Sequence, residues 1–370
     1  MPEGPRTMKA PRIAVVIPAF RTERHIAEVI DTLPDFVSLV VVVDDRSPDR
    51  TAEIVRALQP ADSRIVLHCH PTNQGVGGAV LSGYAVAREH GAEIIVKMDG
   101  DGQMDPAHLA RLVDPIVRGR ADYTKGNRFL HARELLSMPP LRRIGNLGLS
   151  FLTKLASGYW NVFDPTNGYT ALHAGVLDCI DTDCIGRRYF FESSMLIELG
   201  VAGAVVEDVP IPARYGDEVS SLSVARTLSE FPGQLLRGCL RRIWIQHFVR
   251  DFSALALLLT AGLGLATFGA LWGAAWWLES WRTGVVTSTG TVMLSVLPLI
   301  LGVQCLLQCL LLDLQSVPRG AVHRMAARTP VFPRIVRPED QPGEIPVGRL
   351  EEGMHGAVGS EYQVSGRRAA

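Results

Sequence analysis

Two long uncharged runs in the C-terminal half constrain the fold of this chain more than any other feature. Residues 252–278 and 283–312 contain no Asp, Glu, Lys or Arg. Each run exceeds the roughly 20 residues that an α-helix needs to cross a hydrocarbon core of about 30 Å. We therefore predict two transmembrane helices, over residues 253–278 and 290–312. The alternative is a pair of buried helices in a large soluble core, but such helices rarely run this long without a charge.

The composition agrees with a membrane protein and excludes a dedicated nucleic-acid binder. Charged residues make up 20% of the chain and hydrophobic residues 47%, which is too apolar for an average soluble enzyme. The 37 basic and 38 acidic residues give a net charge of -1, so we expect no nucleic-acid partner. No two cysteines form a Cys-x-x-Cys pair, and we expect reduced thiols.

Arginines flank both ends of the predicted helix pair, whereas the short connecting loop holds one Arg and one Glu. Those before the first helix and after the second are Arg226, Arg237, Arg241, Arg242 and Arg250, then Arg319, Arg324 and Arg328. Basic residues beside membrane spans favour the cytoplasmic side. We therefore expect an integral membrane protein whose N-terminal domain and both termini are cytoplasmic. The early apolar run 13–20 is interrupted by Pro18, so no signal peptide is expected.

The segment before the first predicted span, residues 226–251, has the pattern of an amphipathic helix. Weakly polar and apolar residues recur at intervals of three or four and define one face, whereas arginines occupy other positions. This face comprises Leu235, Leu236, Cys239, Ile243 and His247. A basic amphipathic helix beside a membrane span is typical of a helix that lies on anionic headgroups. A solvated helix packed on the preceding domain is the alternative.

The first 225 residues alternate between short apolar runs and helical patterns. Four runs rich in β-branched residues suit strands covered on both faces: Ile13–Ile17, Leu39–Val43, Arg64–Leu67 and Ile94–Met98. Helices are predicted between and after them, around residues 23–33, 50–58, 76–90 and 106–118. This alternation predicts an α/β fold with a doubly wound, mostly parallel sheet, whose ligands bind at the carboxyl ends of the strands.

These patterns divide the chain into five expected segments. They are an N-terminal tail (1–11), an α/β domain (12–225), a juxtamembrane segment (226–251), a two-helix transmembrane hairpin (252–312) and a C-terminal tail (313–370). From about residue 319 the tail is rich in Pro, Gly, Arg and Glu, and we expect it to be irregular.

Polar side chains gather where two of the predicted strands end. Asp44 and Asp45 come directly after five apolar residues, and carboxylates are good acceptors for ribose hydroxyls or a base edge. Helix capping is the alternative for a single Asp, but two adjacent ones favour a ligand. Asp99, Asp101 and Gln103 follow the fourth predicted strand. Alternate residues of an extended segment point the same way, so these three are expected to present oxygens to one hard cation.

Six short motifs follow one another along the chain. They are Ile17-Pro-Ala-Phe20, Asp44-Asp-Arg-Ser-Pro-Asp49, Asn73-Gln-Gly-Val-Gly-Gly-Ala79, Asp99-Gly-Asp-Gly-Gln103, Gly126-Asn-Arg-Phe129 and Asp164-Pro-Thr-Asn-Gly-Tyr169. Together they resemble glycosyltransferase family 2. The Asp-x-Asp-x-Gln form and the two apolar runs are similar to dolichol-phosphate mannose synthases and bacterial polyprenyl-phosphate glycosyltransferases. The resemblance covers about residues 12–312. It implies a GT-A fold, a nucleotide-diphosphate-sugar donor, a polyprenyl phosphate acceptor and Mg²⁺ or Mn²⁺.

The resemblance also implies which residues bind the donor and the metal. The donor set is Pro18, Ala19, Glu23, Asp44, Asp45, Asp99 and Gly100, and the metal set is Asp99, Asp101 and Gln103. One departure concerns the base. Relatives often read Pro-x-Tyr-Asn-Glu after the first strand, whereas here Thr22 takes the position of that Glu and Glu23 comes one residue later. Which nucleotide base the donor carries therefore stays open.

Arginines are the expected ligands of the acceptor phosphate, because the planar guanidinium binds phosphate through two hydrogen bonds and stays charged. The candidates are Arg128, Arg142, Arg143 and Arg214, with a surface charge as the alternative for each. The resemblance implies that Asp164 and Asn167 shape the acceptor side and that Glu192 faces the sugar. The expected catalytic residues are Asp99, Asp101, Arg128 and Arg143. The stretch 75–78 lacks a dinucleotide-binding spacing and is predicted to be a tight strand-to-helix turn.

The leading function is a membrane-bound hexosyltransferase that moves one sugar from a nucleotide diphosphate to polyprenyl phosphate, with its catalytic domain in the cytoplasm. The alternative is a family-2 enzyme that elongates a glycan or glycolipid. Such enzymes usually carry Gln-x-x-Arg-Trp, which the sequence lacks. A non-catalytic membrane scaffold is a third reading. Association into a homo-oligomer through the transmembrane helices is left open.

Overall fold

The computed structural model of the protein describes residues 10–128, 140–212 and 224–326. Seven strands form one sheet in the order β3-β2-β1-β4-β6-β5-β7. Every pairing is parallel except those that β6 makes with β4 and β5. The predicted mostly parallel sheet is confirmed. The strands are β1 (Ile13–Ala19), β2 (Val37–Asp44), β3 (Ile65–Cys69), β4 (Ile94–Lys97), β5 (Tyr123–Asn127), β6 (Thr170–His173) and β7 (Val206–Pro210).

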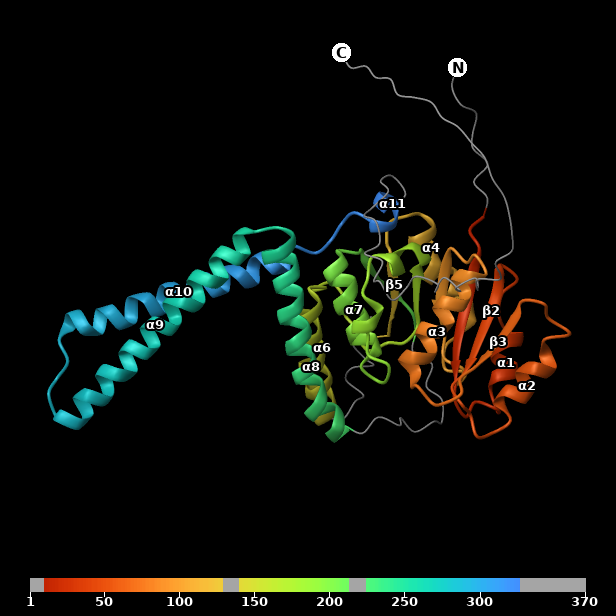
Figure 1. The fold of residues 1–370 in the computed structure, drawn as a ribbon, viewed down its shortest axis with the longest axis horizontal. Helices are drawn as coiled ribbons and strands as arrows, with labels where there is room; N and C mark the ends of the chain where they lie inside the picture. The colour runs from red at the N-terminus through yellow and green to blue at the C-terminus, as the bar shows by residue number, and fades with distance from the viewer. Residues whose placement is uncertain (1–9, 129–139, 213–223, 327–370) are drawn as a thin grey trace, which may run out of the picture. The chain divides into compact units, whose positions relative to one another are not determined.

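Helices cover both faces of the sheet (Figure 1) because its central strands are apolar on both sides. In β2, Val40 and Val42 pack with α1 (Ile26–Asp31), α2 (Thr51–Leu58) and α4 (Leu109–Val117). Their neighbours in β2 point to the opposite face, where they pack with α3 (Val76–Glu89) and α7 (Phe191–Ala202). Three short 3₁₀ turns complete the domain: η1 (Pro106–His108), η2 (Ala174–Asp178) and η3 (Thr182–Cys184). The predicted α/β fold is confirmed.

Three strands, β5, β6 and β7, were not predicted from the sequence. Each is short, and β5 carries the fully buried side chains of Thr124 and Lys125 instead of an apolar run. Their burial depends on pairing with strands far away in the sequence, which local periodicity does not show.

Two further helices lie outside α7, on the side away from the sheet. They are α6 (Pro140–Ser157) and α8 (Val224–Trp244), which continues into a π-helical turn over Ile245–Arg250. A small core joins the three helices through Ala156, Ile197 and Leu235. The opposite face of α8 carries an exposed apolar row, Leu236, Leu240 and Trp244. The predicted helix in this segment is present, but its predicted membrane-facing row is divided: Leu235, Cys239 and Ile243 pack on the domain, as the alternative had it, whereas Leu236 is exposed. A position of the exposed row on a membrane stays a prediction.

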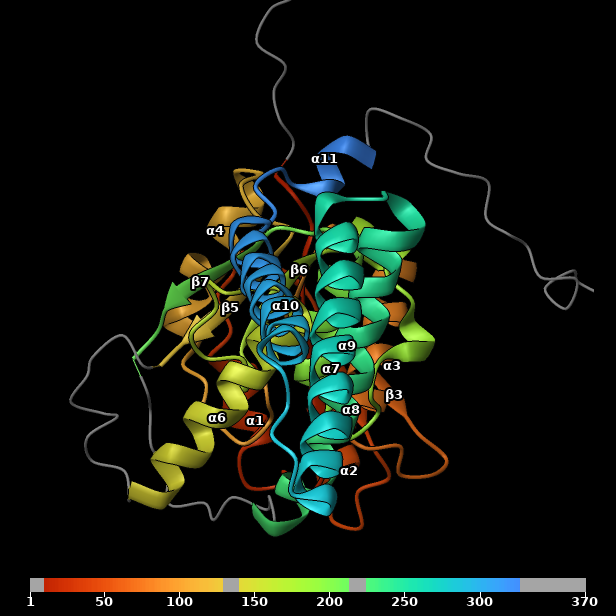
Figure 2. The ribbon, with the colours of Figure 1, turned by 90° about the vertical axis from the view of Figure 1, so that its left-hand side faces the viewer.

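Two long apolar helices follow, α9 (Ala254–Thr283) and α10 (Thr289–Gln315). They lie side by side, as Figures 1 and 2 show. Both are long and apolar enough to cross a membrane, with mean hydropathies of 2.0 and 2.1 in their most apolar windows. They extend beyond the predicted spans because charged residues are tolerated in the last turns.

The chain after α10 returns to the α/β domain and forms a short helix, α11 (Val322–Ala326). The buried carboxylate of Asp122 accepts hydrogen bonds from the backbone amides of Val322 at 2.8 Å and of His323 at 2.9 Å. The imidazole of His323 stacks on that of His173 with 4.2 Å between ring centroids. The helical hairpin is therefore followed by a second attachment to the α/β domain.

Candidate active site at the carboxyl edge of the sheet

The carboxyl ends of β1, β2 and β4 meet at one edge of the sheet, here called the carboxyl edge. Ala19 at the end of β1 pairs with Asp44 at the end of β2. Asp99 follows β4, which pairs with β1 on its other side. The carboxylate of Asp44 is buried and accepts a hydrogen bond from the backbone amide of Ser47 at 3.3 Å. The fold thus places Pro18, Ala19, Asp44 and Asp99 at one edge.

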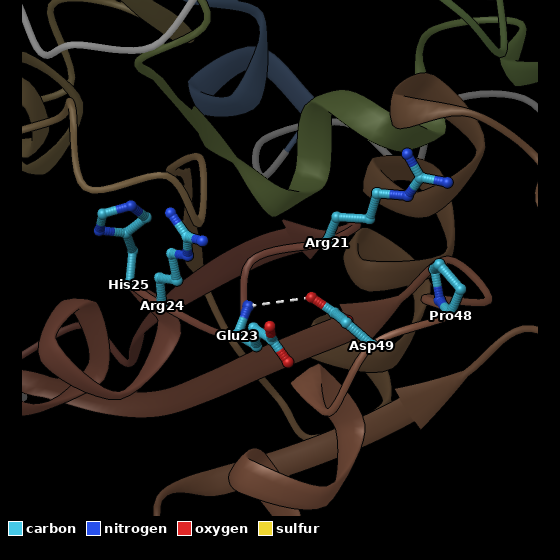
Figure 3. A pocket seen from close by; sticks show the side chains of 6 residues that line it. All are labelled: Arg21, Glu23, Arg24, His25, Pro48 and Asp49. Carbon is cyan, nitrogen blue, oxygen red and sulfur yellow. Dashed lines mark hydrogen bonds between the residues drawn. The ribbon is translucent and has the colours of Figure 1, made fainter.

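A pocket of about 320 Å³ lies between the loops that follow β1 and β2 (Figure 3). The backbone amide of Glu23 donates a hydrogen bond to the carboxylate of Asp49 at 3.3 Å, and the carboxylate of Glu23 accepts one from the amide of Arg50 at 3.1 Å. Glu23 therefore lines the pocket and also ties the two loops together. The lining residues are Arg21, Glu23, Arg24, His25, Pro48 and Asp49.

Asp45, predicted to bind the donor, uses its carboxylate inside the protein. It is buried, and it accepts hydrogen bonds from the backbone amides of Gln74 and Gly75, both at 2.8 Å. The Nδ1 atom of His70 lies 2.8 Å from the same carboxylate. This geometry favours a role for Asp45 in positioning the loop 70–75 over a role in direct donor contact. No sequence pattern indicated that His70 takes part.

The predicted tight turn before α3 is present and is interlocked with the segment before α7. Gly75 has a positive φ of 86°, which favours glycine. A Cβ atom at Gly77 would lie 2.2 Å from the carbonyl oxygen of Gly186, so only glycine fits there. The backbone amide of Gly78 donates to the carbonyl of Arg187 at 3.0 Å. The turn thereby fixes the start of α7, the helix that carries Glu192.

A buried lysine that the sequence did not indicate lies between Asp99, predicted to bind the donor and the metal, and Glu192, predicted to face the sugar. The Nζ atom of Lys97 is 2.8 Å from Asp99 Oδ1 and 3.4 Å from Glu192 Oε1. Burial alone would lower the pKa of Lys97, but the charges of Asp99 and Glu192 together raise it above its ordinary value. The ammonium therefore stays charged. A Cβ atom at Gly168 would lie 2.4 Å from this Nζ and 3.0 Å from Asp99 Oδ2, so the backbone there passes directly over the pair.

The three predicted metal ligands occupy the turn after β4. Asp99, Asp101 and Gln103 are all partly exposed, and Gly100 between the two carboxylates is buried. The backbone amide of Gln103 donates to Asp101 Oδ1 at 3.0 Å. Two carboxylates and one amide oxygen suit a hard cation such as Mg²⁺ or Mn²⁺. Among the described residues, no group of three or more His, Cys, Asp and Glu side chains gathers into a metal cluster.

Arg128, predicted to bind the acceptor phosphate, is oriented by a buried carboxylate. Its Nε donates to Asp164 Oδ2 at 2.8 Å and its Nη2 to Asp164 Oδ1 at 3.2 Å. Asp164 is fully buried, whereas 40% of the Arg128 side chain is exposed. Asn167 donates from Nδ2 to the carbonyl of Gly126 at 2.6 Å. Asp164 and Asn167 thus hold the loop against the end of β5.

The other predicted acceptor ligands are less fully described. Arg142 and Arg143 lie in the first turn of α6, and the structure does not describe their side chains. Arg214 lies outside the described residues. All three stay predictions.

A buried lysine and a half-buried aspartate beneath this loop were also missed. Lys125 donates from Nζ to the carbonyl of Asn167, and burial lowers its pKa to about 8. Asp208 accepts hydrogen bonds from the backbone amide of Phe163 at 2.7 Å and from Asn127 Nδ2 at 3.1 Å. Burial raises the pKa of Asp208 to about 6. The charged and polar residues within β5 and β7 could have pointed to a buried polar site. The same residues break the apolar pattern by which these strands would have been predicted.

Comparison with known proteins places these features in a family. Residues 14–191 match the family described as Glycosyl transferase family 2. The chain is 32% identical over 216 residues to the UDP-N-acetylglucosamine–dolichyl-phosphate N-acetylglucosaminyltransferase of Methanococcus voltae. The matched residues make up 55% of this chain and 86% of that protein. It is 31% identical over 204 residues to the undecaprenyl-phosphate mannosyltransferase of Micrococcus luteus, and that match covers 54% of this chain and 82% of the relative. Among solved structures, glucosyl-3-phosphoglycerate synthase from Mycobacterium tuberculosis is 22% identical with a TM-score of 0.45. The match covers 64% of this chain and 81% of that chain.

Proposed function

Because the chain belongs to glycosyltransferase family 2, we propose that it transfers one sugar from a nucleotide-diphosphate sugar to a polyprenyl phosphate at a membrane surface. One observation carries the proposal. The loop of residues 158–169 contacts both sides of the site, since Asp164 orients Arg128 and Gly168 passes over Lys97 and Asp99. A donor at the carboxyl edge and an anionic acceptor at Arg128 would therefore meet across one loop. The relatives named above, whose acceptors are dolichyl and undecaprenyl phosphate, support the same acceptor class here.

On the donor side, the carboxyl edge supplies acceptors for the nucleoside and ligands for a cation. Asp44 would accept hydrogen bonds from the base or ribose, and the wall of Pro18 and Ala19 would border the base. Asp99, Asp101 and Gln103 would hold Mg²⁺ or Mn²⁺. When bound, such a cation neutralises the diphosphate as the glycosidic bond breaks and so makes it a better leaving group.

On the acceptor side, the lipid phosphate is already an anion at neutral pH, so its attack on the sugar needs little help from a general base. The protein must instead hold it beside another anion against repulsion. The Arg128 guanidinium suits this task because Asp164 fixes its orientation while its exposed part can reach a ligand. Arg142, Arg143 and Arg214 would add further phosphate contacts.

The helices α9 and α10 would anchor the enzyme in the bilayer that holds its acceptor. Only 22% and 11% of the residues in their most apolar windows are buried in the protein, which argues against core helices. The exposed row on α8 would lie on the headgroups. The arginines on both flanks support a cytoplasmic location for the catalytic domain and both termini.

The topology can be tested with two reporters. A reporter fused after residue 330 should lie in the cytoplasm, and a tag in the 284–288 loop between α9 and α10 should lie on the other side of the membrane. Accessibility to a membrane-impermeant reagent measures both. Finding both on the same side would mean that α9 and α10 do not both span.

The function itself is tested by supplying the purified protein in detergent with labelled nucleotide sugars, Mg²⁺ or Mn²⁺, and either polyprenyl phosphate or the free polyprenol. We expect one nucleotide sugar to label polyprenyl phosphate and the alcohol to be inert. Arg118→Ala, a change at an exposed arginine directly after α4, serves as the control variant and should match the wild type. Comparable transfer to the alcohol or to a soluble sugar hydroxyl would contradict the proposal and favour glycan elongation.

A further inference from the structure

A fully buried ion pair lies where α10 meets the catalytic domain. Arg242 on α8 is 1% exposed and donates to the two carboxylate oxygens of Asp313 on α10, at 2.8 and 3.1 Å. Its remaining hydrogen bonds go to the carbonyls of Leu155 at 3.1 Å and Ala156 at 3.0 Å and to Gln246 Oε1 at 3.1 Å. The five N–H groups of the guanidinium are thus matched by five hydrogen bonds.

Stability alone does not account for this pair. Burying two charges carries a desolvation cost, and apolar residues of similar volume often stabilise a protein as well or better. Asp313 also lies in the last turns of α10, where the helix dipole disfavours a negative charge. A pair that is costly in both respects points to a need for one defined geometry at this junction.

The geometry that the pair defines reaches the acceptor loop. Trp160, in the 158–169 loop, donates from Nε1 to Asp313 Oδ2 at 3.0 Å. The Arg242 guanidinium fills the space beside Gly158, where a Cβ atom would lie 2.8 Å from Nη1. Four residues after Trp160 along the same loop comes Asp164, which orients Arg128. The carboxylate of Asp313 is therefore shared by the helix pair, α8 and the loop that holds the phosphate-binding arginine.

We infer that Arg242, Asp313 and Trp160 form a positioning site, here called the junction clamp, that fixes the 158–169 loop relative to the membrane helices. This inference rests on the proposed function. A lipid phosphate has its depth set by the bilayer, so the height of Arg128 above that bilayer decides whether it reaches the headgroup. The clamp sets this height. A water-soluble phosphate can approach Arg128 freely and does not depend on it.

Other contacts fasten the same junction without touching the loop. Gln246 donates from Nε2 to the carbonyl of Gly200 at 2.5 Å, and Arg250 donates from Nη1 to the carbonyl of Val201 at 2.8 Å. These bonds join the π-helical turn to the end of α7. They keep α8 attached when the loop contact is removed, so the clamp can be tested by a change that leaves the junction assembled.

The test compares two acceptors on the same variants. One is a long-chain polyprenyl phosphate in bilayer nanodiscs, and the other is a short-chain, water-soluble isoprenyl phosphate. Trp160→Phe removes the Nε1–H and keeps an aromatic ring. Trp281→Phe, at a 79% exposed position on α9, is the matched control.

For Trp160→Phe we expect the KM for the bilayer acceptor to rise about tenfold, the scale of a hydrogen bond to a charged group. The KM for the nucleotide sugar, and both KM and kcat with the soluble acceptor, should stay within about twofold of the wild type. Equal losses with both acceptors, or no loss with either, would overturn the inference. A wild-type protein that glycosylates neither phosphate would instead contradict the proposed function.

A second variant tests the same contact from the α10 side and does not depend on the first. Asp313→Asn preserves the shape of the side chain and removes its charge. On its own, Asp313→Asn should raise the KM for the bilayer acceptor and leave the KM for the soluble acceptor within about twofold of the wild type. Because Trp160 contributes through its hydrogen bond to Asp313, adding Trp160→Phe should raise the KM for the bilayer acceptor no further. If the fold-changes of the two single variants in that KM multiplied in the double variant, the two residues would act separately, and this would contradict the clamp.

Discussion

The carboxyl edge and the 158–169 loop are built from different kinds of contact. At the carboxyl edge, polar residues lie at the ends of neighbouring strands of the sheet, and several accept hydrogen bonds from nearby backbone amides, as Asp44 does from Ser47. Around the loop, charged side chains pair over long distances in the sequence, such as Arg128 with Asp164 and Arg242 with Asp313. The edge therefore follows from the order of the strands. The loop depends on a network of buried charges that exists only after folding, and this difference predicts different responses to mutation.

The largest effect is expected at the carboxyl edge. Asp101→Asn replaces a carboxylate ligand with an amide in a partly exposed turn, so transfer should fall by about three orders of magnitude or more while the protein stays folded. Excess chelator should have the same effect until Mg²⁺ or Mn²⁺ is restored. Turnover and Mn²⁺ binding by electron paramagnetic resonance measure the two consequences.

Asp114→Asn, at an exposed carboxylate on α4, is the control for this change and should retain activity. Full activity of the wild type in excess chelator would show that transfer does not need a cation at the carboxyl edge.

An intermediate effect is expected at Arg128. Arg128→Ala removes a charge-assisted contact worth about 1.5–3 kcal/mol, or about one to two orders of magnitude in catalytic efficiency, mainly through the KM of the acceptor. Arg128→Lys should recover part of the loss because lysine keeps the charge but cannot form two parallel bonds to Asp164. Steady-state kinetics with each substrate varied in turn decide the point. An effect confined to the KM of the nucleotide sugar would place Arg128 on the donor side.

The smallest effect concerns stability and pH beneath the loop. Burial raises the pKa of Asp208 from 3.8 to about 6, so the folded protein disfavours its ionised form. Ionisation therefore costs stability progressively as pH rises from 3.8 to about 6, and fully above that. Asp208→Asn should raise the melting temperature by a few degrees above pH 6, and the gain should vanish toward pH 3.8. A gain that grows as pH falls would contradict the burial of a charge at this position.

The sequence predicted the parts of the molecule whose signal is local. Strands β1 to β4 and the helices between them have continuous apolar runs or helical periodicity, and α9 and α10 are long and carry charges only in their last turns. The residues of the carboxyl edge follow those strands directly, so their proximity could be inferred from a parallel sheet. The role of Asp45 was less accessible, because its partners Gln74 and Gly75 belong to a loop whose path the sequence does not show.

The remaining features could not be predicted because they depend on distant pairing. Lys97 and Lys125 look like surface residues in the sequence. Their distant partners, Glu192 on α7 and the carbonyl of Asn167 in the 158–169 loop, reach them only in the folded protein. Asp313 ends an apolar run, and no local pattern links it to Trp160, which is 153 residues away. Motifs thus identified the candidate arginines, whereas the contacts that orient them required the fold.

Within the described part of the chain, the 158–169 loop contacts both sides of the proposed site, and Gly168→Ala tests this claim most directly. The added Cβ atom would lie 2.4 Å from Lys97 Nζ and 3.0 Å from Asp99 Oδ2, so the loop or these two buried or partly buried side chains must shift. We expect the KM values of the nucleotide sugar and of polyprenyl phosphate both to rise, by about tenfold each, in a protein that remains folded. Gly148→Ala, on α6 with no atom within 4 Å of the added Cβ, is the control. A rise in only one of the two KM values would contradict the claim.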